Sequence, residues 1–227
     1  MSTKDHQSEP IESASETLQR IFDGHGSVLG SQMADESSRY DVLKKTDFPK
    51  PQRTRRIAVA NQKGGVGKTT STVNTAAALA NKGAQVLVID MDPQGNASTA
   101  LGVSHASGEP SVYDVIEGRS DLGDVITVCP DFPTLDVVPA SIDLSGAELE
   151  VADLPNRNTL LKEALDLYLR QSDKHYDYVF IDCPPSLGLL VINAMCAVTE
   201  MLIPIQAEYY ALEGLGQLIN TIGLVQE

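Results

Sequence analysis

A glycine-rich stretch between an apolar run and a helical pattern constrains the fold of this chain most. The apolar run is residues 57–60, and the stretch that follows it is Asn61-Gln62-Lys63-Gly64-Gly65-Val66-Gly67-Lys68-Thr69-Thr70. Glycines let successive backbone N–H groups turn inward around an anion, and the N-terminus of the next helix adds positive potential. The pattern therefore predicts a phosphate-binding loop that joins a buried strand to a helix.

Two side chains of this loop are expected to act on a bound phosphate group. Lys68 would lie along the β- and γ-phosphates of a nucleotide, and the Thr69 hydroxyl would bind Mg²⁺. The general phosphate-loop pattern has glycine where this chain has Gln62, so the loop is a variant, and it carries a second lysine, Lys63. A glycine-rich turn without a ligand is the alternative, and the surrounding strand and helix patterns disfavour it.

Strand-like and helix-like segments alternate from residue 57 onward. Buried strands are expected at residues 57–60, 86–90, 135–139, 178–182 and 201–205, and helices at residues 69–81, 160–169, 187–198 and 212–225. This alternation predicts an α/β fold with a doubly wound, mainly parallel sheet. Pro204 is unfavourable inside a sheet and is expected near the end of the last strand. In the last helix, Leu215, Ile219 and Ile222 share the expected buried face.

Three carboxylates stand where these strands end. Ligands of such sheets bind beyond the carboxyl ends of the strands. Asp182 ends an apolar strand, the place expected for a carboxylate that supports Mg²⁺. The side chains of Asp90 and Asp92 would point to the same side of the sheet if the strand persisted through Asp92. One of them could then support the water shell of the metal while the other positions an attacking water. N-capping of a following turn is the alternative role for this pair.

Residues 1–52 are predicted to be a disordered, acidic and polar tail in front of a domain that spans residues 53–227. The one helical pattern in the tail covers residues 11–23, with Ile11, Ala14, Leu18, Ile21 and Phe22 on one face. A weakly helical, solvated segment is favoured over a partner-docking helix because isolated helices of this length are marginal. The basic residues between 50 and 56 are interpreted as a solvated linker rather than a contact with an anionic surface.

Charge and cysteine content exclude several classes of protein. The chain carries a net charge of −14, and residues 69–227 contain six bases and 22 acids, a net charge of −16. Because affinity for phosphate backbones depends on clustered Lys and Arg, this stretch disfavours nucleic-acid binding. The longest apolar run, residues 187–198, is shorter than the roughly 20 residues of a membrane span. Three cysteines without metal-type spacing, Cys129, Cys183 and Cys196, suit a reducing compartment.

Four segments resemble one family of ATPases. KGGVGKTT at residues 63–70 looks like the deviant Walker A motif, and VIDMDPQGN at residues 88–96 looks like its partner motif. FIDCPPS at residues 180–186 resembles the Walker B strand, and QAEYYALEG at residues 206–214 is similar to a further family segment. In this order they resemble the ParA/Soj-type chromosome- and plasmid-partitioning ATPases, from about residue 57 onward.

The resemblance implies a weak, Mg²⁺-dependent ATPase that cycles between an ATP-bound sandwich dimer and an ADP-bound or apo monomer. It implies that ATP binds to Lys63, Gly64, Gly65, Val66, Gly67, Lys68, Thr69 and Thr70. Lys63 would reach the phosphates of the partner subunit, and Lys68 would act within its own chain. Asp92 would position the hydrolytic water. The metal would be held by Thr69, with Asp90 and Asp182 supporting it through water.

The same resemblance implies partners and a location. A ParB-type centromere-binding protein would stimulate hydrolysis, the ATP dimer of the family binds DNA non-specifically, and the location would be the bacterial cytoplasm, at the nucleoid. Family members continue beyond the position of Glu227, so the domain is expected to be truncated on its C-terminal side and this chain is not expected to bind DNA.

Three other interpretations remain open. A MinD-like septum-positioning ATPase would need an amphipathic membrane anchor, which this chain is not expected to have. A nitrogenase iron protein would need cysteines that bind its cluster, and Cys183 is expected in the core. The third is a non-enzymatic or inactive nucleotide-binding fragment of a partitioning ATPase.

Overall fold

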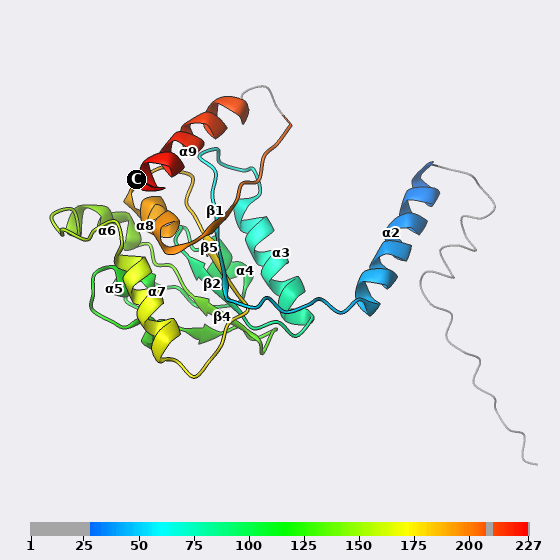
Figure 1. The fold of residues 1–227 in the computed structure, drawn as a ribbon, viewed down its shortest axis with the longest axis horizontal. Coiled ribbons are helices and arrows are strands. Elements are labelled where there is room, and N and C mark those ends of the chain that lie inside the picture. The colour runs from blue at the N-terminus through cyan, green and yellow to red at the C-terminus, as the bar shows by residue number, and fades with distance from the viewer. Residues whose placement is uncertain (1–27, 208–210, 227) are drawn as a thin grey trace, which may run out of the picture. The chain divides into compact units, whose positions relative to one another are not determined.

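A six-stranded sheet forms the centre of residues 50–227 in this computed structural model, which describes residues 28–207 and 211–226 (Figure 1). The spatial order is β3-β4-β2-β5-β1-β6. All pairings are parallel except that of β3 with β4. The predicted α/β fold is therefore confirmed. The strands are β1 Arg55–Val59, β2 Val86–Asp90, β3 Thr127–Val128, β4 Leu135–Val138, β5 Tyr178–Asp182 and β6 Glu200–Leu202.

Each face of the sheet carries its own apolar core. Along β2, Val86 and Val88 belong to one core, and Leu87 and Ile89 belong to the other. Because successive side chains of a strand point to opposite faces, a strand covered on both sides is apolar throughout. Helix α3, Lys68–Asn81, packs in one core, whereas α5 Val112–Ile116, α7 Leu160–Gln171, α8 Leu189–Ala197 and α9 Ala211–Gln226 contribute to the other (Figure 1).

The long elements agree with the sequence, and the short ones were not predicted. β2 and β5 have the predicted bounds, and all four predicted helices are present within two residues at either end. β6 ends at Leu202 rather than at residue 205, two residues before Pro204, whose ring nitrogen cannot donate to a sheet. Within residues 50–227, the elements absent from the prediction are α4 Asn96–Ala100, α5, the 3₁₀ helix η1 Leu122–Val125, β3 and α6 Leu144–Glu150.

The buried face of α9 differs from the predicted one. Leu218 is fully buried, whereas Ile219 is 55% exposed, so the prediction for Ile219 is wrong. Ile222 packs against the core as predicted, together with Val225. Positions 218, 222 and 225 follow the four- and three-residue spacing of one helical face, and an alternative stripe through 215, 219 and 222 fits the sequence equally well. None of the helices in the described part of the chain is long and apolar enough to cross a membrane.

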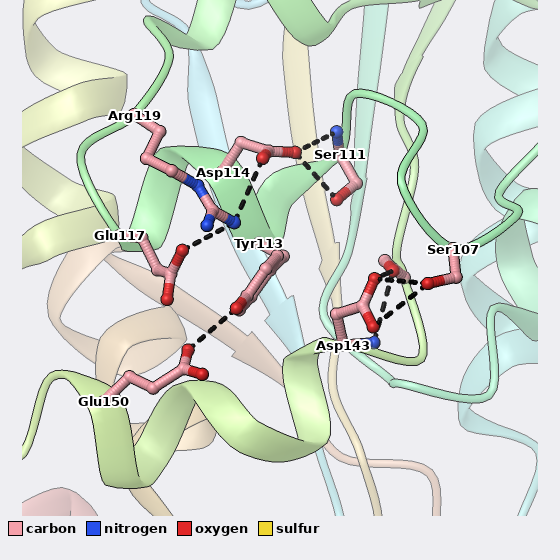
Figure 2. A network of polar contacts seen from close by, with 9 residues as sticks. Ser107, Ser111, Tyr113, Asp114, Glu117, Arg119, Asp143 and Glu150 are labelled. Atoms are coloured by element: carbon pink, nitrogen blue, oxygen red, sulfur yellow. Dashed lines mark hydrogen bonds and ion pairs between the residues drawn. The ribbon is translucent and has the colours of Figure 1, made fainter.

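A polar network fixes the loops around α5 and α6 (Figure 2). The Asp114 carboxylate accepts hydrogen bonds from the Ser111 backbone N–H (3.0 Å) and hydroxyl (3.3 Å) at the start of α5. Arg119 forms ion pairs with Asp114 (3.3 Å) and Glu117 (2.5 Å). The Tyr113 hydroxyl donates to Glu150 at the end of α6 (2.8 Å). These bonds hold two short helices that have few residues to bury.

Residues 1–49 form a separate unit, of which the structure describes helix α2, Val28–Lys45. The helical pattern at residues 11–23 lies outside the described residues. The sequence predicts no helix at residues 28–45, because α2 has no apolar face. Large apolar side chains such as Tyr40, Val42 and Leu43 are exposed on it. Lys44 and Lys45 in the last turn favour the helix through its dipole.

Asn193 on α8 generates a prediction about stability. This side chain is fully buried; it donates to the Arg157 (2.7 Å) and Leu189 (3.1 Å) carbonyls and accepts from the Leu161 N–H at the start of α7 (3.2 Å). Asn193→Ala removes these three hydrogen bonds, deprives the buried Leu161 N–H of this acceptor and leaves a cavity, so it should lower the free energy of unfolding by about 2–4 kcal/mol. Urea denaturation measures it. The exposed Asn74→Ala is the control. An equally small change in both variants would show that the three hydrogen bonds of Asn193 do not stabilise the fold.

Candidate phosphate-binding site

The loop between β1 and α3 has the geometry of an anion cradle. Gly65 (φ +74°) and Gly67 (φ +91°) adopt left-handed backbone conformations that favour glycine, and Gly67 precedes the first residue of α3. A Cβ added at Gly64, Gly65 or Gly67 would meet nothing within 4 Å. No side chain caps the helix N-terminus. The glycine backbone of the loop is therefore open to a ligand, as a phosphate group requires.

Lys68 lies in this loop with most of its side chain buried. Its Nζ donates to the Lys63 carbonyl at 3.3 Å. Burial lowers the pKa of Lys68, and the negative charges of Asp182 and Asp92 oppose that effect. An ammonium group that is bonded to a loop carbonyl and feels the charges of two carboxylates is preorganised to bind an anion.

Asp182 links β5 to the first turns of α3. Its Oδ2 accepts the Thr69 hydroxyl at 2.7 Å, and its Oδ1 accepts the Thr72 hydroxyl at 2.9 Å. The carboxylate is fully buried. The structure thus brings together Thr69 and Asp182, two of the residues predicted to hold a metal, and adds Thr72, which the sequence analysis missed. Thr72 follows Thr69 by three residues and therefore lies on the same face of the helix.

Asp90 lies beside Asp182, as its register partner on β2. Its Oδ2 accepts the Ser98 N–H (2.8 Å) and hydroxyl (2.7 Å), and its Oδ1 accepts the Asp92 N–H (3.1 Å). The strand ends at Asp90 and does not persist through Asp92. Asp92 Oδ1 accepts the Gln94 N–H at 3.0 Å in the turn that leads to α4. Both carboxylates therefore stabilise this turn, which is the alternative considered for the pair.

Burial raises the pKa of two of these carboxylates, Asp90 and Asp182, above the usual range of an aspartate. Burial raises the pKa of Asp182 to about 6, and the charges of Asp90 and Asp92 add to the effect while Thr69 and Thr72 oppose it. Burial likewise raises the pKa of Asp90, against the hydrogen bonds from Ser98 and Asp92. A cation would relieve this cost. No group of three His, Cys, Asp or Glu side chains within residues 28–207 and 211–226 could hold a metal alone.

Two residues at the rim of the loop were not predicted to belong to the site. The buried Asn61 side chain donates to the Pro204 carbonyl (2.8 Å) and accepts the Lys63 N–H (3.0 Å). Gln206 accepts a hydrogen bond from Lys63 Nζ (3.2 Å). Of the other predicted ligands, Val66 is half-buried in the loop and Thr70 is exposed on α3. Cys183, behind the site, is fully buried, as expected for a core residue.

The fold and the site agree with the comparison with known proteins. The sequence profile of the AAA domain family matches residues 54–227. The chain belongs to this family. Within it the chain is similar to Soj of Bacillus subtilis, with 52% identity over 75% of this chain and 66% of Soj, and to ParA of Caulobacter vibrioides, with 47% identity over 75% and 62%. The predicted resemblance to ParA/Soj-type ATPases is therefore confirmed.

A solved structure similar to this chain carries a nucleotide analogue. It is the cobyrinic acid a,c-diamide synthase of Mycobacterium smegmatis, determined with an ATP analogue and magnesium. It shares 40% identity and a TM-score of 0.69 with this chain, over 76% of this chain and 68% of that one. The chain spans about two thirds or less of the length of the Soj and ParA relatives.

The raised pKa of Asp182 predicts an inverse relation between stability and pH. Between about pH 4 and 6 the folded chain holds a proton that the unfolded chain has lost, so stability falls as pH rises through that range. Asp182→Asn should reduce this slope, leaving the part that is due to Asp90, and should raise the free energy of unfolding at pH 7.5 by about 2 kcal/mol. Urea denaturation in EDTA across this pH range measures it. The exposed Asp131→Asn is the control and should keep the slope. If Asp182→Asn instead lowers the free energy of unfolding at pH 7.5, the charge of Asp182 is compensated in the folded chain and the prediction is wrong.

Proposed function

We propose that this chain is a Mg²⁺-dependent ATPase of the Soj/ParA partitioning type, with ATP bound at residues 63–70. The observation that carries the proposal is the meeting of Lys68, Thr69 and Asp182 under an open glycine-lined loop at the carboxyl ends of the strands. The nucleotide and magnesium in the Mycobacterium smegmatis structure support the choice of ligands.

The residues of the site take distinct roles in this proposal. Bound ATP supplies the phosphoryl group that passes to water, and Mg²⁺ neutralises charge on the phosphate oxygens. Lys68 binds the phosphates from its own chain, and Thr69 holds the metal with the hydroxyl that now donates to Asp182. Asp90 and Asp182 support the metal through water. Asp92 orients the attacking water, and Lys63 acts on the phosphates of a partner subunit.

The assembly and partners belong to the same proposal. We infer an ATP-dependent homodimer that returns to a monomer after hydrolysis, and a ParB-type partner that stimulates the reaction. The acidic balance of residues 69–227 argues against DNA as a ligand of this stretch. The name of the Mycobacterium smegmatis protein suggests amide synthesis instead. The identity with Soj, at 52%, favours the partitioning cycle.

Lys68→Ala tests nucleotide binding. Lys68 is the buried cation of the loop, so its loss should weaken ATP affinity at least about 100-fold, because charge-assisted bonds to phosphate are the strong ones. Equilibrium dialysis with ATP and Mg²⁺ measures this. The exposed Lys162→Ala on α7 is the matched control and should bind normally. ATP affinity that is unchanged in Lys68→Ala would overturn the assignment of the loop.

Two substitutions of Asp92 distinguish a role in catalysis from a role in stabilising the turn. Asp92→Asn keeps an oxygen for the Gln94 N–H but removes the negative charge, whereas Asp92→Ala removes both. Both should lower ATP turnover by about 10²–10⁴ while ATP binding persists, since water positioning acts in the transition state. Gel filtration should then show a dimer that persists with ATP. Normal turnover in Asp92→Asn alone would assign Asp92 to the turn. An elution volume that ATP never changes, even in the unaltered chain, would favour an inactive fragment.

A further inference from the structure

The side-chain amide of Gln206 bonds to two residues of the phosphate loop. Its Oε1 accepts from Lys63 Nζ at 3.2 Å, and its Nε2 donates to the Gly65 carbonyl at 3.2 Å. One amide thus uses its acceptor and its donor on the same loop. A carboxylate at this position would keep the bond to Lys63 but repel the Gly65 carbonyl, and a shorter or apolar side chain would keep neither.

The end of β6 brings Gln206 to this place. β1 and β6 are parallel, with Val59 opposite Leu202, and the Ala60 N–H donates to the Leu202 carbonyl at 3.2 Å. Past that point the bond from Asn61 to the Pro204 carbonyl, 2.8 Å long, keeps the two segments side by side. Gln206 follows two residues later and reaches Gly65, where the chain turns with φ +74°.

The hydrogen bond from Lys63 to Gln206 limits what the Lys63 ammonium group can reach. Lys63 is the residue proposed to reach the phosphates of a partner subunit, yet here its ammonium group bonds to a side chain of its own subunit. A phosphate oxygen carries charge and is a stronger acceptor than a neutral amide. The ammonium group can therefore exchange from Gln206 to a phosphate, and the strength of the Gln206 bond opposes that exchange.

We propose that Gln206 is a positioning residue that holds Lys63 on its own subunit until nucleotide-bound subunits associate. This inference rests on the proposed function, because it assigns Lys63 to the partner's nucleotide. Release of Lys63 from Gln206 is a cost of association. Removing the bond lowers that cost, and replacing the amide by a carboxylate raises it.

The reactivity of Lys63 in the nucleotide-free chain tests the contact itself. The 227-residue chain is labelled briefly with an amine-acetylating reagent, and Lys63 is quantified by mass spectrometry against the exposed Lys162. Gln206→Ala should increase labelling of Lys63 about threefold to tenfold, and Gln206→Glu should decrease it. The exposed Gln217→Ala on α9 is the matched control and should not change it. Equal labelling in Gln206→Ala and the unaltered chain would overturn the proposal.

Association with ATP tests the consequence. Analytical ultracentrifugation with ATP and Mg²⁺ should show Gln206→Ala associating at a protein concentration about threefold to tenfold lower, and Gln206→Glu at a higher one. A role limited to the shape of the loop would weaken association in both variants, and that outcome would also overturn the proposal. If the unaltered chain binds no ATP, the proposed function fails, and labelling of Lys63 still decides whether Gln206 holds this lysine.

Discussion

Two buried carboxylates side by side are the constraint on which the site depends. Asp90 and Asp182 are register partners on adjacent parallel strands, which lie about 4.8 Å apart, and both are fully buried. The Thr69 and Thr72 hydroxyls and Ser98 supply hydrogen bonds, yet the pKa of Asp182 still rises to about 6. Donors without charge therefore compensate the pair only in part. In the proposed function, Lys68 and a divalent ion supply the compensation that remains.

The sheet explains why this cost is confined to one edge. β2 and β5 are apolar along their length because each face of the sheet carries a core, and the buried carboxylates of these two strands, Asp90 and Asp182, stand at their ends. The carboxyl ends of parallel strands meet at the same edge, and α3 begins there. The two cores stabilise the fold, and the buried carboxylates lower this stability, as functional sites commonly do.

The parts of this structure that could be predicted are those encoded by neighbouring residues in the sequence. Apolar strands such as β2 and β5 and the glycine-rich loop are local in sequence, and their bounds and place agree with the structure. Helices of five to seven residues, α4 to α6, are too short to show a helical period. The partners of the carboxylates were predicted only where a motif named them. Ser98 and Gln206 bond to residues 8 and 143 positions away, so their contacts depend on turns and strand register that no local pattern encodes.

The short length of β6 gives the segment after it a different kind of attachment to the loop. β6 is a three-residue edge strand, and its ladder with β1 stops before Pro204. If the backbone pairing with β1 continued past β6, each N–H and C=O of the following segment would have a partner within the chain, and a ligand would not replace it. Side-chain bonds from Asn61 and Gln206 take over instead. Asn61 is buried and uses both ends of its amide within the chain, so its contact is structural. Gln206 is exposed and bonds to an ammonium group that a phosphate attracts more strongly, so this contact can exchange.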